Sequence, residues 1–222
     1  MSFVSLQKYK KWRKFAIQMN PNPQSAIDCY KSIGALSKGI YKDKGSKFLS
    51  FAFPVTGEDQ AKALISNLKK EYFDARHHCW AYRIGHTGET FRYNDDGEPS
   101  STAGKPIYGQ ILSNELSDIL IVVVRYFGGI LLGTSGLIVA YKSAAADAIA
   151  NAQIIEKIAT VRCRVEFDYL QMNAVMKCLK DFQLAPQNTV FENACSLEVD
   201  VRLTMEHPFL ESMNKICICT KV

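Results

Sequence analysis

The apolar run from Ile119 to Tyr126 constrains the fold of this chain more than any other segment. It is rich in β-branched residues, and apolar side chains occupy both its odd and its even positions. A strand with this pattern needs cover on both faces, so we predict that it lies centrally in its sheet. Its longest uninterrupted aliphatic part, residues 119–124, is about a third of the length that a membrane span needs.

A glycine-rich turn separates this strand from a predicted helix at residues 137–152. That helix contains many small side chains, among them Ala140, Ala144 and Ala148, which permit close packing on the sheet. Upstream the hydrophobic period changes several times, which predicts alternating strands and helices. We expect strands at 48–53, 79–84 and 89–93, a turn at 85–88, and helices at 58–72 and 107–113. An α+β N-terminal domain is therefore expected over residues 28–153.

Residues 151–157 form the best candidate boundary, because a complete new pattern begins after them. Strands are expected at 160–167, 188–193, 195–204 and 217–222, and helices at 170–182 and 207–216. The order βαββαβ over about 65 residues is that of the split-βαβ or ferredoxin-like arrangement. We therefore expect a ferredoxin-like domain over residues 158–222.

Composition is that of a soluble globular protein. Of 222 residues, 47% are hydrophobic and 22% are charged, and no short apolar segment near the start resembles a signal peptide. We therefore expect a cytoplasmic protein with no membrane partner. The seven cysteines are odd in number and scattered without a CxxC pair, which favours reduced, partly buried thiols over disulfides or a zinc site.

The net charge of +5 comes entirely from the first 19 residues, which hold five basic side chains and no acidic one. From residue 20 onward 22 basic residues face 22 acidic ones, so charge alone does not predict a nucleic-acid surface in the folded part. The head has two interpretations. It is an amphipathic helix with Tyr9, Trp12 and Met19 opposite its lysines, or an extension of residues 1–27 outside the folded unit.

Three carboxylates, Asp95, Asp96 and Glu98, flank Gly97 within four positions. Such a cluster could hold Mg²⁺ or supply a general base. It could equally be an Asx-type turn whose carboxylates accept backbone N–H groups or cap the next segment. Both interpretations are open at this level.

Arg125 ends the buried strand, where a guanidinium must find a partner. It either pairs with one of the three carboxylates or faces an anionic ligand such as phosphate. His77 and His78 precede the apolar strand at 79–84, and alternation is expected to send one inward and the other outward. A lone inward histidine is more often a core residue than a catalyst.

The turn after the central strand carries several small and hydroxyl residues: Gly128, Gly129, Gly133, Thr134 and Ser135. Free N–H groups at the start of the next helix could cradle phosphate there, or the glycines could serve only tight packing. A second segment, residues 97–105, fails the spacing of the phosphate-binding loop GxxxxGK[ST].

Three segments resemble the signature segments of the YigZ/IMPACT family: DARHHCWAYRIG at 74–85, RYNDDGEPSSTAGKPI at 92–107 and VVVRYFGGILLGTSGLIVAYKSAA at 122–145. The resemblance covers roughly residues 28–222. It implies an N-terminal domain with the fold of the second domain of ribosomal small-subunit protein five, followed by a ferredoxin-like domain. The chain departs from the family at Ser101, where glycine is usual, and a positive φ there would affect the loop.

The resemblance also implies a function. Eukaryotic family members are translational regulators that compete for a ribosome-associated activator of a stress kinase, and the fold occurs in ribosomal proteins and elongation factors. We therefore expect a non-enzymatic protein without cofactor or metal, whose partner is RNA, the ribosome or a translation-associated protein. Its binding face would be the sheet end carrying Arg83, Lys105 and Arg125.

Two alternatives remain. One is a metal- or nucleotide-dependent enzyme acting on a phosphate-containing substrate with His77, Asp95, Asp96 and Glu98. Because His77 belongs to the family motif, it is the first choice for chemistry. The other is a pure protein-interaction module.

Overall fold

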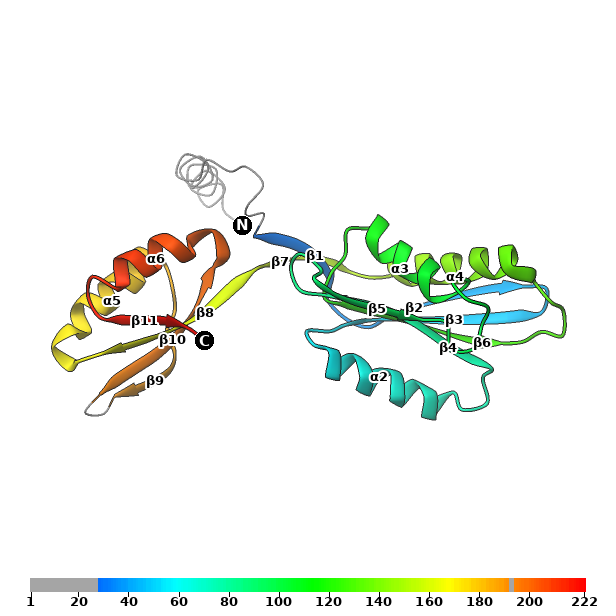
Figure 1. The fold of residues 1–222 in the computed structure, drawn as a ribbon, viewed down its shortest axis with the longest axis horizontal. Coiled ribbons are helices and arrows are strands. Elements are labelled where there is room, and N and C mark those ends of the chain that lie inside the picture. The colour runs from blue at the N-terminus through cyan, green and yellow to red at the C-terminus, as the bar shows by residue number, and fades with distance from the viewer. Residues whose placement is uncertain (1–27, 192–193) are drawn as a thin grey trace. The chain divides into compact units, whose positions relative to one another are not determined.

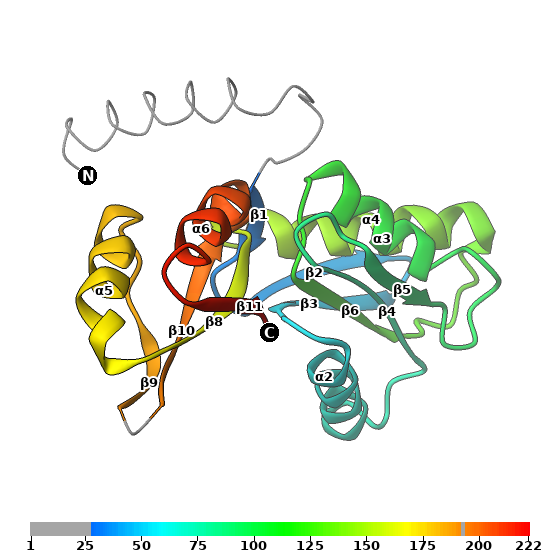
Figure 2. The same cartoon turned by 60° about the vertical axis from the view of Figure 1, so that its left-hand side comes forward.

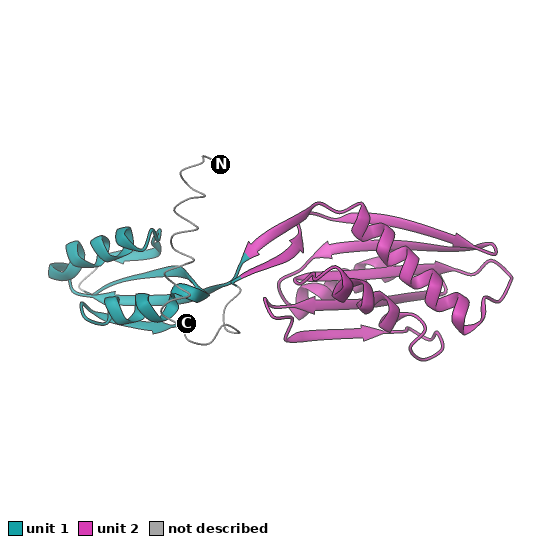
Figure 3. Cartoon of the chain, turned by 90° about the horizontal axis from the view of Figure 1, so that it is seen from above, with its two compact units in different colours: residues 1–28, 158–222 teal, residues 29–157 magenta. Residues whose placement is uncertain are grey.

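The computed structural model describes residues 28–191 and 194–222. The two interpretations of the basic head fall on residues outside these ranges. The described chain divides into two compact units, Cys29–Lys157 and a smaller one that contains Ile158–Val222 (Figure 3). Both contain helices and sheets, so the chain is a mixed α/β protein.

A five-stranded sheet forms the body of the larger unit. Its spatial order is β2-β3-β6-β4-β5, with every neighbouring pair antiparallel. The strands are β2 (Ser37–Asp43), β3 (Ser46–Pro54), β4 (His77–Ile84), β5 (Thr90–Asn94) and β6 (Ile119–Tyr126). The central position predicted for residues 119–126 is confirmed.

Helices cover both faces of this sheet. α3 (Gly104–Ser113) and α4 (Gly133–Ala150) lie on one face, and α2 (Glu58–Glu71) lies on the other (Figures 1 and 2). Residues 119, 121 and 123 of β6 belong to the core on the α3 and α4 side, whereas residues 120, 122 and 124 belong to the core under α2. The apolar character of residues 119–124 of β6, on both faces, follows from this double cover.

Several elements differ from their expected bounds. α3 begins at Gly104 rather than residue 107, because Pro106 fits the first turn of a helix, where its missing N–H has no intrahelical partner to lose. α4 begins at Gly133 rather than 137. β2 was not predicted, because Gly39 interrupts its pattern; α4 passes so close to Gly39 that a Cβ there would meet the backbone of Ala148.

A separate two-stranded sheet consists of β1 (Cys29–Ile33) and β7 (Ile154–Ile158). Residues 151–157 were interpreted as a boundary, and no strand was predicted there. Its side chains alternate between exposed and half-buried rather than between buried and exposed, which leaves a weak periodic pattern in the sequence.

The smaller unit has the order βαββαβ that the sequence predicts. Its elements are β8 (Thr160–Phe167), α5 (Met172–Asp181), β9 (Gln187–Phe191), β10 (Cys195–Arg202), α6 (Glu206–Met213) and β11 (Ile218–Lys221), with short 3₁₀ turns η1 (Tyr169–Gln171) and η2 (Leu203–Met205). The sheet order is β11-β8-β10-β9, with α5 and α6 on one face (Figure 1). The odd-numbered residues Cys163, Val165 and Phe167 of β8 enter the core.

The other face of the smaller sheet carries charges of both signs. Arg162 pairs with Asp200 at 2.9 Å, and Arg164 pairs with Glu166 at 3.1 Å. Five of the seven cysteines are buried. Among the described helices, none is long and apolar enough to cross a membrane.

Candidate binding site at the end of the central strand

The segment Asp95–Glu98 forms a tight turn after edge strand β5. The N–H of Glu98 donates to the carbonyl of Asp95 at 2.9 Å, and the two central residues, Asp96 and Gly97, have φ of 44° and 86°. Two consecutive positive φ values are characteristic of a type I′ turn, which favours glycine, asparagine and aspartate. The turn directs the three carboxylates to three different sets of partners.

Asp95 caps helix α3. One of its carboxylate oxygens accepts the N–H groups of Ala103 at 3.0 Å and Gly104 at 2.8 Å. The other accepts the N–H of Ser101 at 2.9 Å. These N–H groups have no partners within the helix. Asp95, eight residues before Ala103, therefore satisfies them as an N-cap side chain would.

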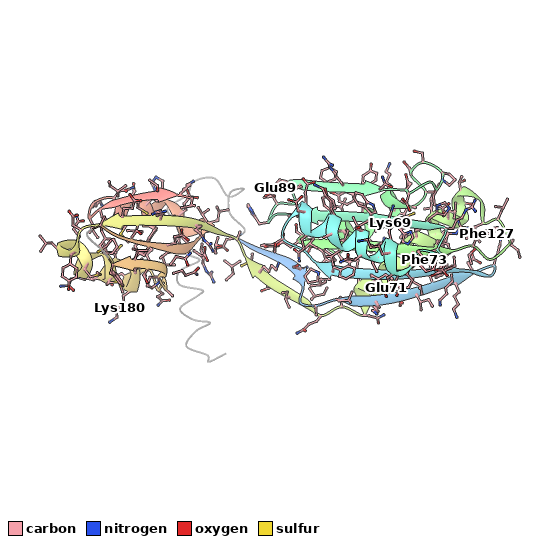
Figure 4. All side chains as sticks on the ribbon, turned by 90° about the horizontal axis from the view of Figure 1, so that it is seen from below. Lys69, Glu71, Phe73, Glu89, Phe127 and Lys180 are labelled. Carbon is pink, nitrogen blue, oxygen red and sulfur yellow. The ribbon has the colours of Figure 1, made fainter. Side chains whose placement is uncertain are left out.

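Asp96 joins α2 to the start of β4. Its carboxylate accepts the backbone N–H of His78 at 2.7 Å and pairs with Lys69 at 2.7 Å (Figure 4 labels Lys69 on α2). Burial raises the pKa of Asp96, but Lys69 and the His78 N–H outweigh it, so the pKa lies below its ordinary value. Asp96 therefore stays ionised at neutral pH.

Glu98 is the acceptor at the centre of a buried cluster. Its Oε1 accepts hydrogen bonds from Arg125 Nη1 at 2.5 Å and from the Tyr141 hydroxyl at 2.8 Å. His77 Nε2 lies 3.8 Å from the same oxygen. The side chains of Glu98 and Arg125 are only 4% and 7% exposed. We call these four residues the Arg125 cluster. Two partners were expected for Arg125, a carboxylate of the turn or an anionic ligand. In the structure Arg125 pairs with the carboxylate of Glu98.

Aromatic rings enclose the Arg125 guanidinium. It lies 5.4 Å from the ring centroid of Phe48 and 5.7 Å from that of Phe127, within the range of cation–π interaction. In the described part of the chain, its Nε is the one buried side-chain nitrogen or oxygen without a hydrogen-bond partner. The guanidinium is thus held by a carboxylate and two rings, and it does not present its fork to solvent.

Both histidines are covered, on opposite faces of the sheet. His77 Nδ1 lies 2.8 Å from the carbonyl oxygen of Asp96, and His78 Nε2 lies 3.1 Å from that of Tyr72. The expectation that one of them points outward is wrong. Alternation does send them to opposite faces, but helices or loops cover each face.

The pH dependence of stability should reveal His78. Burial lowers its pKa, more than its bond to Tyr72 and the charge of Asp96 raise it. The unfolded chain therefore binds a proton more readily, and the free energy of unfolding falls as pH decreases through about 6.5. Replacing His78 with glutamine should flatten this dependence between about pH 5 and 7 in urea titrations. The same change at His207, whose side chain is 84% exposed, is the control, and parallel curves for wild type and His78→Gln would contradict the assignment.

The glycine turn after β6 has a structural basis at its first position. A Cβ on Gly128 would overlap the backbone of Gly45 and Ser46 in the β2–β3 turn. Gly129 and Gly133 have φ of 88° and 71°. Thr134 and Ser135, in the first turn of α4, are exposed, and that turn contains no acidic residue. The close approach at Gly128 and the positive φ values account for glycine at these three positions.

The three basic residues expected to share one sheet end do not do so. His77 pairs with Arg125 at one end of β6, whereas Arg83 pairs with Ile119 at the other end. That expectation is wrong because antiparallel register separates the ends of β4. Figure 4 shows the same separation, with Phe127 and Glu89 at opposite ends of the larger unit.

Arg83 and Lys105 differ in their surroundings. Arg83 donates to the carbonyl oxygens of Leu116 at 2.9 Å and Thr87 at 2.6 Å, and so braces the β4–β5 turn. Lys105 is exposed in the first turn of α3. Of the two, Lys105 is the one available to a partner.

Ser101 adopts the backbone conformation that favours glycine. Its φ is 63°, a left-handed value that costs a non-glycine residue about 1–2 kcal/mol. Because glycine loses more entropy on folding, we expect Ser101→Gly to stabilise the protein by a net amount of about 0.5–1 kcal/mol. Ser101→Ala should give no such gain. Chemical denaturation compares the three proteins, and equal stabilities of the glycine and alanine variants would contradict the prediction.

Burial affects the titration of two further polar groups near the turn. Burial raises the pKa values of the Cys79 thiol and the Tyr141 hydroxyl, so both stay protonated. Within residues 28–191 and 194–222, no three histidine, cysteine or acidic side chains gather so that they could hold a metal ion. The three carboxylates act as cap, bridge and ion-pair partner. This geometry agrees with the turn-and-cap interpretation.

Sequence reasoning missed four members of this site: Lys69, Phe48, Phe127 and Tyr141. Tyr141 left a trace, because it is a large residue within the small-residue face of its helix. Phe48 and Tyr141 also meet edge to face, with ring centroids 5.1 Å apart. Nothing local in the sequence connects either residue to Glu98.

Comparison with known proteins connects this architecture to a family. Residues 44–149 match the Impact N-terminal domain. A Haemophilus influenzae IMPACT family member is 36% identical over 143 residues, 64% of this chain and 69% of the relative. The Bacillus subtilis IMPACT family member YvyE is 31% identical over 171 residues, 77% of this chain and 79% of the relative.

A solved structure agrees with the sequence comparison. It is the crystal structure of a hypothetical protein, with a TM-score of 0.66 and 27% identity, and the match covers 86% of this chain and 93% of that one. The segments that build the turn, the cap and the Arg125 cluster fall inside the matched domain. The chain therefore belongs to the IMPACT family.

Proposed function

We propose that this protein regulates translation by binding RNA, the ribosome or a translation-associated protein, and that it has no catalytic activity. The family supports a role in translation, because its eukaryotic members are regulators of that process. These partners would place the protein in the cytoplasm. One observation supports the absence of catalysis in this proposal. All three carboxylates of the Asp95–Glu98 turn accept hydrogen bonds from other groups of the protein itself.

A general base or metal ligand needs a carboxylate oxygen that a substrate or ion can reach. Here Glu98 is buried against Arg125 and Tyr141, and Asp95 is committed to the start of α3. Such a turn acts as a rigid frame. It holds the first turn of α3, with Lys105 exposed, in a fixed position for a partner.

The charge distribution predicts how strongly binding depends on salt concentration. Beyond residue 19 the basic and acidic residues balance, so binding by the folded units would rest on local contacts rather than on net charge. We therefore expect binding to depend moderately on salt. The slope of log affinity against log salt would correspond to few phosphate contacts, at roughly 0.7–0.9 per contact.

The test is cosedimentation of the full chain with ribosomal particles, together with binding of structured and single-stranded RNA across a salt series. A chain starting at residue 20 is measured beside it. Binding retained by the shorter chain would support recognition by the folded units. If neither chain binds RNA or ribosomal particles at low salt, the RNA and ribosome branches fail and a protein partner is left. If the full chain binds and the shorter chain does not, the binding site lies in residues 1–19 instead of the folded units.

A further inference from the structure

Three near-parallel aromatic rings lie at the surface of the larger unit, where β5 meets α3. Tyr108 stacks on Phe91 with ring centroids 5.0 Å apart and an interplanar angle of 16°, and on Tyr93 at 5.9 Å and 28°. Phe91 is 49% exposed and Tyr93 is 42% exposed. We call Phe91, Tyr93 and Tyr108 the aromatic face. None of them belongs to the Arg125 cluster.

Strand position explains why these rings share one side. Phe91 and Tyr93 are two residues apart on β5, so their side chains point to the same face of the sheet. β5 is an edge strand, and among the residues that the structure describes no further strand of this sheet covers its outer side. At the opposite edge of the sheet, α4 satisfies part of the edge strand: the N–H of Ile40 on β2 donates a hydrogen bond to Asp147 of α4 at 2.8 Å. No hydrogen bond of this kind joins α4 to β5 among the described residues.

Large half-exposed rings contribute less to stability than buried ones, because part of their apolar area stays in water. Tyr108 is partly buried against the main core, whereas Phe91 and Tyr93 are in neither core of the larger unit. The main core therefore packs against Tyr108, whereas Phe91 and Tyr93 stack on Tyr108 and remain 49% and 42% exposed. Stacked, exposed rings are the platforms on which unpaired bases bind.

Local charge agrees with an anionic, base-carrying ligand. Lys105 precedes Tyr108 by three residues, which places both on one side of α3, and it is exposed. Neither β5 nor α3 contains an acidic residue. A phosphate near Lys105 would therefore meet no carboxylate from the two elements that form the surface.

We propose that the aromatic face binds single-stranded RNA, with bases stacked on Phe91 and Tyr93 and a backbone phosphate at Lys105. This inference rests on the proposed function and names the surface that performs it. Double-stranded RNA keeps its bases stacked within the helix, so it offers none to these rings. The site should consequently prefer single strands and tolerate many sequences, because every base has a π-face.

The test uses the full chain and fluorescently labelled 12-nucleotide oligo-uridine and oligo-adenosine, with a duplex RNA of equal length. The double variant Phe91→Leu with Tyr93→Leu should bind the single strands more weakly, by about 5- to 150-fold for each stacked base lost. Phe91→Tyr and Tyr93→Phe keep the rings and should bind like wild type. Lys105→Ala should lower the salt slope by about 0.7.

Phe73→Leu is the matched control, since Phe73 is 82% exposed but lies after the end of α2 (Figure 4). It should leave RNA affinity unchanged. Unfolding curves of all variants check that losses of binding are not losses of fold. If the leucine variant unfolds, Lys105→Ala still tests the site, because Lys105 is exposed and an unchanged salt slope would contradict a phosphate contact there.

The outcomes separate this inference from the proposed function. If the leucine double variant binds single-stranded RNA like wild type, the aromatic face is the wrong surface while RNA binding stands. If wild type binds neither RNA nor ribosomal particles, those branches of the proposed function fail as well. Wild type could bind ribosomal particles without binding free single-stranded RNA. If the leucine variant then no longer cosediments with the particles, the aromatic face contacts another ribosomal component, and the inference is overturned.

Discussion

Replacing Glu98 with alanine is expected to lower the free energy of unfolding by about 3–5 kcal/mol, because it leaves the Arg125 guanidinium buried without its countercharge. The loss should be large because the ion pair is shielded from water and Tyr141 loses its acceptor as well. Urea denaturation at neutral pH measures it, with the midpoint and the slope fitted separately.

Two controls give the Glu98 result its meaning. Asp59→Ala removes the exposed pair with Lys62, whose side chains are 99% and 61% exposed, and should cost about 0–1 kcal/mol. The triple variant Glu98→Leu, Arg125→Met and Tyr141→Phe removes both charges of the ion pair and the Tyr141 hydroxyl that donates to Glu98. It should recover most of the lost stability. A change of under about 1 kcal/mol in Glu98→Ala would contradict a buried ion pair.

Replacing Asp95 with alanine is expected to cost about 2–4 kcal/mol, combining a lost helix cap with buried N–H groups that lose their acceptor. Ala103 and Gly104 are both buried, so water cannot easily replace the carboxylate there. The same urea titration applies. Hydrogen exchange adds a local readout, since the amides of Ala103 and Gly104 should exchange faster in the variant.

Asp95→Asn separates the cap from the charge. An asparagine oxygen can still accept the N–H groups of Ala103 and Gly104, but its NH₂ group faces the N–H of Ser101, which then lacks an acceptor. Its cost should therefore fall between those of wild type and Asp95→Ala. Equal stability of Asp95→Ala and wild type would show that the turn does not hold α3.

These two sites and the aromatic face should behave differently in binding assays. Variants of Glu98 or Asp95 weaken the frame, so stability and partner binding should fall together. Variants of Phe91 and Tyr93 change an exposed surface, so binding should fall with little change in unfolding. A catalytic centre at the turn would instead lose activity in variants that keep their stability.

Sequence patterning predicted those elements that depend on local burial. Residues 119–126 became β6 and residues 160–167 became β8, because each strand carries a clear pattern. In β6 residues 119–124 are all apolar, and in β8 apolar and polar residues alternate. β1, β2 and β7 were missed for the opposite reason. Their partners, rather than their own periodicity, make them strands: β1 and β7 pair with each other, and β2 lies beside β3 under α4.

For the candidate site, the sequence by itself determined what local chemistry controls: Arg125 at the end of a buried strand needs a partner, and residues 95–98 form either a turn or a metal or general-base site. Only the tertiary structure decided which partners meet. Glu98 joins Arg125 across 27 positions and Tyr141 across 43, because antiparallel register and the placement of α4 bring them together. The same register puts Arg83 at the opposite end of β6. Side-chain pairing over such separations depends on the relative positions of whole elements, and no local sequence pattern encodes those positions.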